Sequence, residues 1–196
     1  VGDEDAISTL LKMLSAVFEL KVRAQLGPDR IDAKEVRVLN RMIRYVNDER
    51  GERVEYEADP RHAELIVAQL GLQRAKSVTT PGVKLKAEEA IAVSPDLTAD
   101  LVKLYRSVTM RGQYKSADRS DLQYVTKERE RVMKKPTERD LGALKRMASY
   151  LLKRPRLAQL FWRQSEPKKI VTCTDADHAG CPITRQSTMC IAVMSG

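Results

Sequence analysis

Residues 172–181, near the end of the chain, read TCTDADHAGC and hold two carboxylates, an imidazole and two thiols. Thiolates and imidazoles are the ligands that zinc favours, whereas carboxylate oxygens suit magnesium. This short stretch therefore raises two candidate metal sites, and the functional interpretation depends on which of them is correct.

The zinc interpretation adds one more thiol from further along the chain. Its ligands would follow the pattern C-x4-H-x2-C-x8-C, which is not the spacing of a common zinc module. Two of the cysteines also fall in apparent strands, where a buried cysteine commonly acts as a small hydrophobic residue. A small zinc-stabilised nucleic-acid-binding module is therefore an alternative interpretation, with the ligands Cys173, His178, Cys181 and Cys190.

The magnesium interpretation rests on Asp175, which follows the apolar run of residues 170–174 (IVTCT). A carboxylate at a strand end, facing phosphate and a hard cation, is how nucleases hold Mg²⁺ for phosphodiester hydrolysis. Such a site needs several carboxylates from different elements, and this strand supplies one, or two if Asp177 is included. The spacing alone also allows both residues simply to cap a turn.

The charge balance favours a polyanionic partner. The chain has 196 residues, a formal net charge of +8 and a sequence pI of about 9.5, so nucleic acid is the simplest candidate partner. The charge alone is equally well explained by solubility. Aromatic residues make up only 5%, which argues against a base-stacking platform built of Phe and Tyr. The hydrophobic content of 42% is typical of a globular protein.

Basic residues crowd the region 97–156. Several phosphate contacts make nucleic-acid binding strong and salt-sensitive, so together these side chains could track a phosphate backbone. For any single residue, a solvated helix face is the simpler interpretation. The candidate phosphate-binding residues are Arg106, Arg111, Lys115, Arg119, Lys127, Arg131, Lys145 and Arg146.

Hydrophobic periodicity predicts a helix-rich α+β fold around these residues. Asp59 with Pro60 forms a helix start, Gly71 a helix end, and Thr137 with Asp140 a near capping box. The predicted helices cover 5–19, 60–70, a stretch from about 98, about 120–133, and a stretch from 137.

Strands are predicted in two other regions. The segment 35–46 fits either a helix or a strand, but the turn-forming residues 47–51 and the alternating residues 54–57 favour a β-hairpin. Residues 77–94 predict an exposed connector. From residue 157 onward three apolar stretches, LAQLFW, KKIVTCTD and STMCIAVMS, predict strands.

The cysteine count and the chain ends indicate a cellular context. The three cysteines all lie in the last stretch, and their odd number argues for an intracellular, reducing compartment. No apolar run is long enough to cross a bilayer. The sequence starts VGDEDAISTLL, without an initiator Met or the pattern of a signal peptide, which suggests a piece of a longer chain.

Short motifs in a fixed order give a more specific indication. Their order and spacing resemble the reverse transcriptase–ribonuclease H region of copia-type retrotransposon polyproteins, where the pattern is approximately YRS, RPD, PT, KR-x3-YL, SDADWAG and RKST. The matching residues are Tyr105-Arg106-Ser107, Arg119-Ser120-Asp121-Leu122, Pro136-Thr137, Ala143-Leu144-Lys145-Arg146 with Tyr150-Leu151, and 174–181 (TDADHAGC) followed by 184–188 (TRQST).

The resemblance covers nearly the whole chain and implies its organisation. The helix ending at residues 18–21 resembles the palm helix after the polymerase active-site turn, and Thr80-Pro81 resembles the "TP" of the family. The implied parts are the end of the palm at 1–57, the start of the thumb and a linker at 58–96, basic thumb and connection helices at 97–156, and truncated N-terminal strands of ribonuclease H at 157–196.

The sequence departs from the family pattern at several positions. Ser120 replaces the usual proline, His178 a tryptophan, Gln186 a lysine, and Met189-Cys190 a Ser-Gly pair. The polymerase aspartate pair would precede this sequence, and the later ribonuclease H carboxylates would follow it. The isolated chain is therefore expected to have neither activity, and to retain at most salt-sensitive nucleic-acid binding.

The resemblance implies a parent that synthesises DNA on an RNA template and hydrolyses the RNA strand of the hybrid. In that parent Asp175 would be a catalytic carboxylate that holds Mg²⁺, and the basic helices would track the template–primer. The implied partners are RNA–DNA hybrid and the remainder of the polyprotein, with no membrane, in a cytoplasmic particle or the nucleus. A degenerate remnant without activity is a further alternative.

Overall fold

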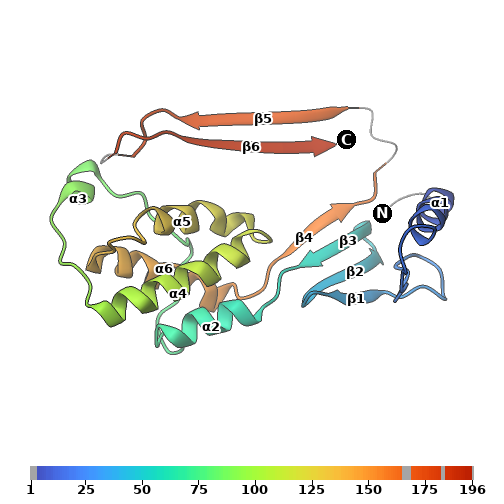
Figure 1. Ribbon diagram of the computed structural model, residues 1–196, viewed down its shortest axis with the longest axis horizontal. Helices are drawn as coiled ribbons and strands as arrows, with labels where there is room; N and C mark the ends of the chain where they lie inside the picture. Colours follow the sequence, from blue (N-terminus) through green and yellow to red (C-terminus); the bar gives the residue numbers. More distant parts are fainter. Residues whose placement is uncertain (1–3, 165–168, 182–183, 196) are drawn as a thin grey trace.

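The computed structural model describes residues 4–164, 169–181 and 184–195, which form a mixture of helices and antiparallel strands (Figure 1). This confirms the predicted α+β class. The elements, in chain order, are α1 (Glu4–Ser15), β1 (Glu35–Val38), β2 (Arg41–Asp48), β3 (Gly51–Glu57), α2 (Arg61–Gln69), α3 (Ala87–Ile91), α4 (Ala99–Ser116), α5 (Ser120–Arg131), α6 (Glu138–Lys153), β4 (Ala158–Trp162), β5 (Ile170–Asp177) and β6 (Thr188–Ser195).

Helices α2, α4, α5 and α6 form a helical body around one apolar core. The inward stripe of α6 carries Leu144, Met147 and Leu151, which are almost completely buried against Tyr105 and Val108 of α4. These positions recur every three or four residues, as the sequence pattern predicted. Burial of this stripe drives the assembly of the body, because isolated helices of this length are marginal in water.

The predicted helix ends are confirmed at the positions that carry capping side chains. The carboxylate of Asp140 accepts hydrogen bonds from the Thr137 backbone N–H at 2.9 Å and from the Thr137 hydroxyl at 2.6 Å. Asp59 Oδ1 accepts the backbone N–H of Arg61 at 3.0 Å. Gly71 follows α2 with a φ of 66°, the left-handed conformation that favours glycine at a helix end.

A four-stranded antiparallel sheet precedes and follows the helical body, in the order β1-β2-β3-β4. The predicted hairpin between β2 and β3 is confirmed, with Asp48 opposite Gly51. The prediction that 35–46 forms a single strand of that hairpin is wrong, because the chain reverses within it at Leu39 and Asn40. Both residues have positive φ, 49° and 64°, and β1 therefore pairs with β2.

Strand β4 returns from the end of α6 to the free edge of β3. It pairs antiparallel along its whole length, with Ala158 opposite Glu57 and Trp162 opposite Arg53. The predicted strand at LAQLFW therefore exists, and its partner comes from the sheet formed by the early strands. The residues of the helical body are therefore inserted in the sequence between β3 and β4, two neighbouring strands of one sheet.

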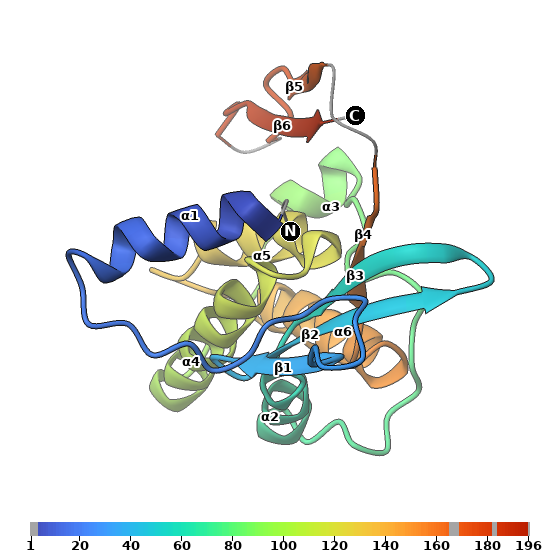
Figure 2. The same ribbon diagram turned by 90° about the vertical axis from the view of Figure 1, so that its right-hand side faces the viewer.

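Strands β5 and β6 form a separate hairpin that lies beyond α5 (Figures 1 and 2). Every residue of β5 is exposed, so neither face of the strand is buried. One hydrogen bond to the helical body is formed by Lys127 Nζ of α5, which donates to the Thr188 hydroxyl. The hairpin therefore has little packing of its own against the described residues.

Two further elements differ from their sequence-based bounds. The first helix ends at Ser15 rather than at 19, and its apolar stripe faces solvent, with Leu10 55% exposed. The predicted connector at 77–94 contains the short helix α3. The remaining predicted helices lie within a few residues of their expected positions.

Two glycines in the helical body have opposite surroundings, which predicts opposite effects of substitution. A Cβ at Gly142 of α6 would meet no atom within 4 Å, whereas one at Gly112 of α4 would lie 3.2 Å from Met147 Cε. Gly142→Ala should raise the free energy of unfolding by about 0.5–1 kcal/mol, because alanine is the better helix former. Gly112→Leu should lower it by about 1–3 kcal/mol through overpacking.

Urea denaturation of the two variants and the wild-type chain measures both changes. If Gly112→Leu matched the wild type, the close packing of α4 against α6 would be contradicted. If Gly142→Ala lowered the stability, the open surroundings of Gly142 would be contradicted.

Candidate nucleic-acid interface

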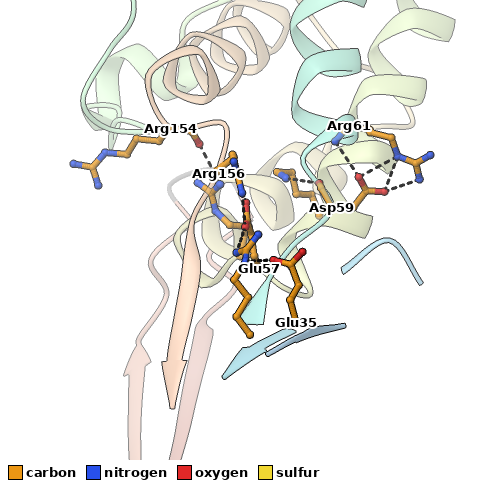
Figure 3. A network of polar contacts seen from close by, with 9 residues as sticks. Glu35, Glu57, Asp59, Arg61, Arg154 and Arg156 are labelled. Atoms are coloured by element: carbon orange, nitrogen blue, oxygen red, sulfur yellow. Dashed lines mark hydrogen bonds and ion pairs between the residues drawn. The ribbon is translucent and has the colours of Figure 1, made fainter. Parts of the chain in front are cut away.

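The junction between the sheet and the helical body is built on a buried carboxylate at the end of β3 (Figure 3). Glu57 is only 4% exposed and accepts hydrogen bonds from Arg44 of β2 at 2.7 Å and from Arg156, which precedes β4, at 2.7 Å. Hydrogen bonds from Arg156, supported by those from Arg44, lower the pKa of Glu57 to about 2. The carboxylate therefore stays ionised and holds three segments together.

Asp59, two residues further on, connects the junction to α4. Its carboxylate caps α2 and forms an ion pair with Arg61 at 2.7 Å. Its backbone carbonyl accepts a hydrogen bond of 2.8 Å from the buried ammonium group of Lys115. Burial, together with the neighbouring Arg119 cation, lowers the pKa of Lys115 to about 8. Lys115 is 2% exposed, so it anchors α4 beneath the start of α2 and does not reach solvent.

Arg119 is the centre of a second buried network. Its guanidinium makes two hydrogen bonds to the Asp121 carboxylate, at 2.8 and 2.7 Å, and a third at 3.1 Å to the Arg154 carbonyl at the end of α6. The hydroxyl of Tyr150 donates to the same carboxylate at 2.7 Å. Arg119 is fully buried, and this network fixes the start of α5 against the end of α6.

A third contact ties the sheet to the turn between α4 and α5. Asp118 accepts hydrogen bonds from Arg41 of β2 at 2.7 Å and from the Tyr56 hydroxyl of β3 at 2.8 Å. The side chain of Gln159 on β4 donates to the Asp118 carbonyl at 2.7 Å. Strands β2, β3 and β4 therefore all bind Asp118 in the turn between α4 and α5, and these contacts fix the orientation of the sheet relative to the helical body.

These contacts change the role of two of the eight candidate phosphate-binding residues. Lys115 and Arg119 are buried and donate to protein oxygens, so in the folded chain they are structural anchors rather than phosphate ligands. Six candidates remain at least partly accessible, two on each of three helices: Arg106 and Arg111 on α4, Lys127 and Arg131 on α5, and Lys145 and Arg146 on α6.

The six accessible residues differ in how far their charge is already engaged. Lys127 and Arg131 both pair with Glu128, at 3.2 and 3.1 Å, so part of their charge is neutralised locally. Arg106 binds backbone carbonyls at the end of α5, at 2.9 and 3.1 Å, and keeps its net charge. Lys145 is exposed, and no ion pair engages it among the described residues.

Asp175 lies on β5, exposed and directly opposite Cys190 of β6. The strand predicted around it is confirmed. Among the described residues, no three His, Cys, Asp or Glu side chains lie close enough to hold a metal ion. The structure therefore supplies Asp175 as a single oxygen ligand, which does not make a magnesium site by itself, and it does not bring the four candidate zinc ligands together.

Sequence reasoning missed the residues that form the junction. Glu57, Asp118 and Arg156 gave no signal in the sequence, because their partners are remote along the chain: 99 positions separate Arg156 from Glu57. Arg119 and Asp121 are two positions apart, so their pairing could have been suspected. The buried state of Lys115 could not, since its partner is a backbone carbonyl of another element.

No family model matches the chain, and no curated protein or solved structure matches it either. The structure defines the fold class: the chain is an α+β protein in which a helical body carries accessible basic residues on three helices. In the part of the chain that the structure describes, no helix has the length and hydropathy needed to cross a membrane.

The lowered pKa of Lys115 predicts a rise in stability at alkaline pH. Its folded pKa of about 8 lies below the ordinary 10.5, so the unfolded chain binds this proton more tightly. Below pH 8 both states are protonated and the buried charge destabilises the fold; as the pH rises through 8 the folded state releases the proton and this cost is removed. The free energy of unfolding should therefore gain about 1–2 kcal/mol between about pH 8 and 9.5.

Denaturation at several pH values tests this slope in the wild type and in Lys115→Met, which should lack it. Lys103→Met is the control, because Lys103 lies on the same helix with its side chain 79% exposed and should keep the wild-type slope. Equal slopes in all three proteins would contradict the buried position of Lys115.

The lowered pKa of Glu57 predicts an acid-labile junction. Its folded pKa of about 2 lies below the ordinary 4.5, so the stabilisation is complete above pH 4.5 and is lost as the pH falls toward 2. Glu57→Gln should lower the free energy of unfolding by about 2–4 kcal/mol near neutral pH, because it leaves two arginines without their anion. The difference from the wild type should narrow below pH 4.5, and Glu64→Gln on the exposed face of α2 should show neither effect.

Proposed function

We propose that this chain is part of the reverse transcriptase and ribonuclease H region of a copia-like retrotransposon, and that it binds RNA–DNA hybrid through its helical body. The observation that carries the proposal is the set of six accessible basic residues on three consecutive helices, which suits a phosphate backbone. The ordered motifs of the sequence supply the family, and the net charge of +8 supports a polyanionic partner.

The buried network around Arg119 is consistent with this origin. Arg119 and Asp121 come from one of the resembling motifs and Tyr150 from another, 29 positions later in the chain than Asp121. The side chains of Arg119 and Tyr150 both donate hydrogen bonds to the Asp121 carboxylate. A structural reason thus exists for these residue types to occur together, which supports the interpretation of the motifs as parts of one fold.

The catalytic part of the proposal concerns the parent protein rather than this chain alone. In the parent, Mg²⁺ would activate water for hydrolysis of the RNA strand, and Asp175 would be one of its oxygen ligands. The contribution of this chain is one exposed carboxylate on a hairpin next to α5. An intracellular location and association with the remainder of the polyprotein belong to the same proposal.

The test is the salt dependence of hybrid binding, measured by fluorescence anisotropy with a labelled RNA–DNA duplex. If the six basic residues all contact phosphate, the logarithm of the binding constant should fall with the logarithm of salt concentration with a slope of about 4 to 5. Lys145→Gln should reduce this slope by about 1, because one phosphate contact is lost. Lys12→Gln on α1 removes the same exposed charge and should leave the slope unchanged.

A response that is flat in salt would contradict the proposal. Stoichiometric zinc in the purified chain would instead favour the alternative zinc-stabilised module. A lack of preference for hybrid over heparin would favour the degenerate remnant.

A further inference from the structure

Two segments of the chain contain basic residues but no acidic ones. Residues 65–87 hold four Lys or Arg and residues 141–164 hold six, without a single Asp or Glu in either. The rest of the chain then has 25 basic against 27 acidic side chains. The whole positive net charge of the protein therefore comes from these two segments, which are separated by more than fifty residues in sequence.

The fold brings the two segments into contact. The backbone N–H of Val78 donates to the Ser149 carbonyl of α6 at 3.4 Å, and Arg146 of α6 donates to the Thr80 hydroxyl at 2.9 Å. Val78 also packs against the core of the helical body. Figure 2 shows the connector between α2 and α3 passing α6. The last residues of the connector, which we define as residues 72–80, are thus attached to α6.

The basic side chains of the connector and of the end of α6 are accessible and form no ion pairs among the described residues, whereas Arg156 and Arg163, later in the second segment, pair with Glu57 and Glu52. Arg74, Lys76, Lys145 and Lys153 are exposed, and within the described residues none of them forms an ion pair. Arg154 is also exposed, with its guanidinium 6.0 Å from the centre of the Tyr150 ring, and Arg146 is half-buried beneath the connector. By contrast, Lys127 and Arg131 of α5 share Glu128.

We propose that these side chains form one phosphate-binding surface, the connector–α6 strip, which binds the sugar–phosphate backbone of nucleic acid. The inference rests on the proposed function and locates its main contact surface, two of whose six residues lie on a connector where the sequence pattern indicated no phosphate contact. The strip consists of Arg74, Lys76, Lys145, Arg146, Lys153 and Arg154.

The dimensions of the strip suit a nucleic-acid strand. Lys145 and Lys153 are eight residues apart on α6, which corresponds to about 12 Å along the helix axis. At 3.4 Å per nucleotide of one strand, this distance spans about three to four phosphates. Two adjoining segments with several cations and no carboxylate of their own also favour a continuous polyanion over a protein partner, whose surface charges are mixed.

The connector part of the strip is tested by the double variant Arg74→Gln/Lys76→Gln. The chain offers a matched control, Lys21→Gln/Arg23→Gln, which removes one lysine and one arginine at the same spacing from another exposed segment without regular secondary structure. Both variants have the same net charge, so a difference between them reports position and not total charge. Neither pair forms an ion pair among the described residues, so both variants should keep the wild-type melting temperature.

Affinity for labelled RNA–DNA hybrid is measured across a salt series for the three proteins. The connector variant should bind about tenfold more weakly at about 0.1 M salt, and its slope in salt should fall by about 1.5–2, because two phosphate contacts are lost. The control should stay within about twofold of the wild type, with the same slope. Elution from heparin–agarose should follow the same order.

The outcomes separate the strip from the proposed function. If the wild type binds hybrid with the expected salt dependence but both variants weaken it equally, only net charge matters and the strip is overturned while the proposed function stands. If the wild type does not bind hybrid, the proposed function is overturned; the strip survives only if heparin still distinguishes the two variants. Displacement of labelled hybrid by polyglutamate as effectively as by unlabelled hybrid would assign the surface to acidic protein and overturn the strip.

Discussion

The arrangement of this protein depends on one buried carboxylate. Glu57 ends β3 where the chain leaves the sheet for the helical body, and it accepts hydrogen bonds from arginines on both sides, Arg44 in the neighbouring strand and Arg156 before β4. A carboxylate removed from water needs such partners, since an unpaired buried charge is very costly. Neighbouring residues add further contacts: the backbone carbonyl of Asp59 accepts a hydrogen bond from Lys115 of α4, and the Asp118 carboxylate accepts hydrogen bonds from Arg41 and Tyr56 of the sheet.

The local features of the fold could be predicted from the sequence, and the long-range ones could not. Apolar periodicity and the capping residues Asp59 and Thr137 located the helices, because these signals lie within a few residues of the structure that they cause. The reversal at Leu39 and Asn40 was missed, since no glycine marks it. The partner of β4 could not be inferred, because strand pairing across the helical body leaves no periodic trace in the sequence.

The candidate interface shows the same division. The clustering of basic residues in the sequence identified Lys145 and Arg146, which are accessible. It also selected Lys115 and Arg119, whose charged groups are buried and bind protein oxygens. Lys115 is buried against the backbone carbonyl of Asp59, which the distribution of acidic residues does not indicate. For Arg119 the difference lies in the supply of carboxylates: Asp121 is two positions away, whereas the residues of the connector–α6 strip come from segments without Asp or Glu. The distribution of acidic residues was therefore as informative as that of the basic ones, once the fold had shown which segments are neighbours.

The return of β4 to β3 has a consequence for synthesis on the ribosome. Arg156 and Glu57 are separated by 99 positions, so the first three strands emerge long before the fourth. Until then the edge of β3 has unpaired backbone groups, and Glu57 lacks one of its two arginines. The helical body, whose contacts form mostly between successive helices, can assemble meanwhile and shorten the distance over which the chain must close. The vectorial order of translation thus makes the sheet the last part of this unit to be completed, although its first strands are among the earliest residues made.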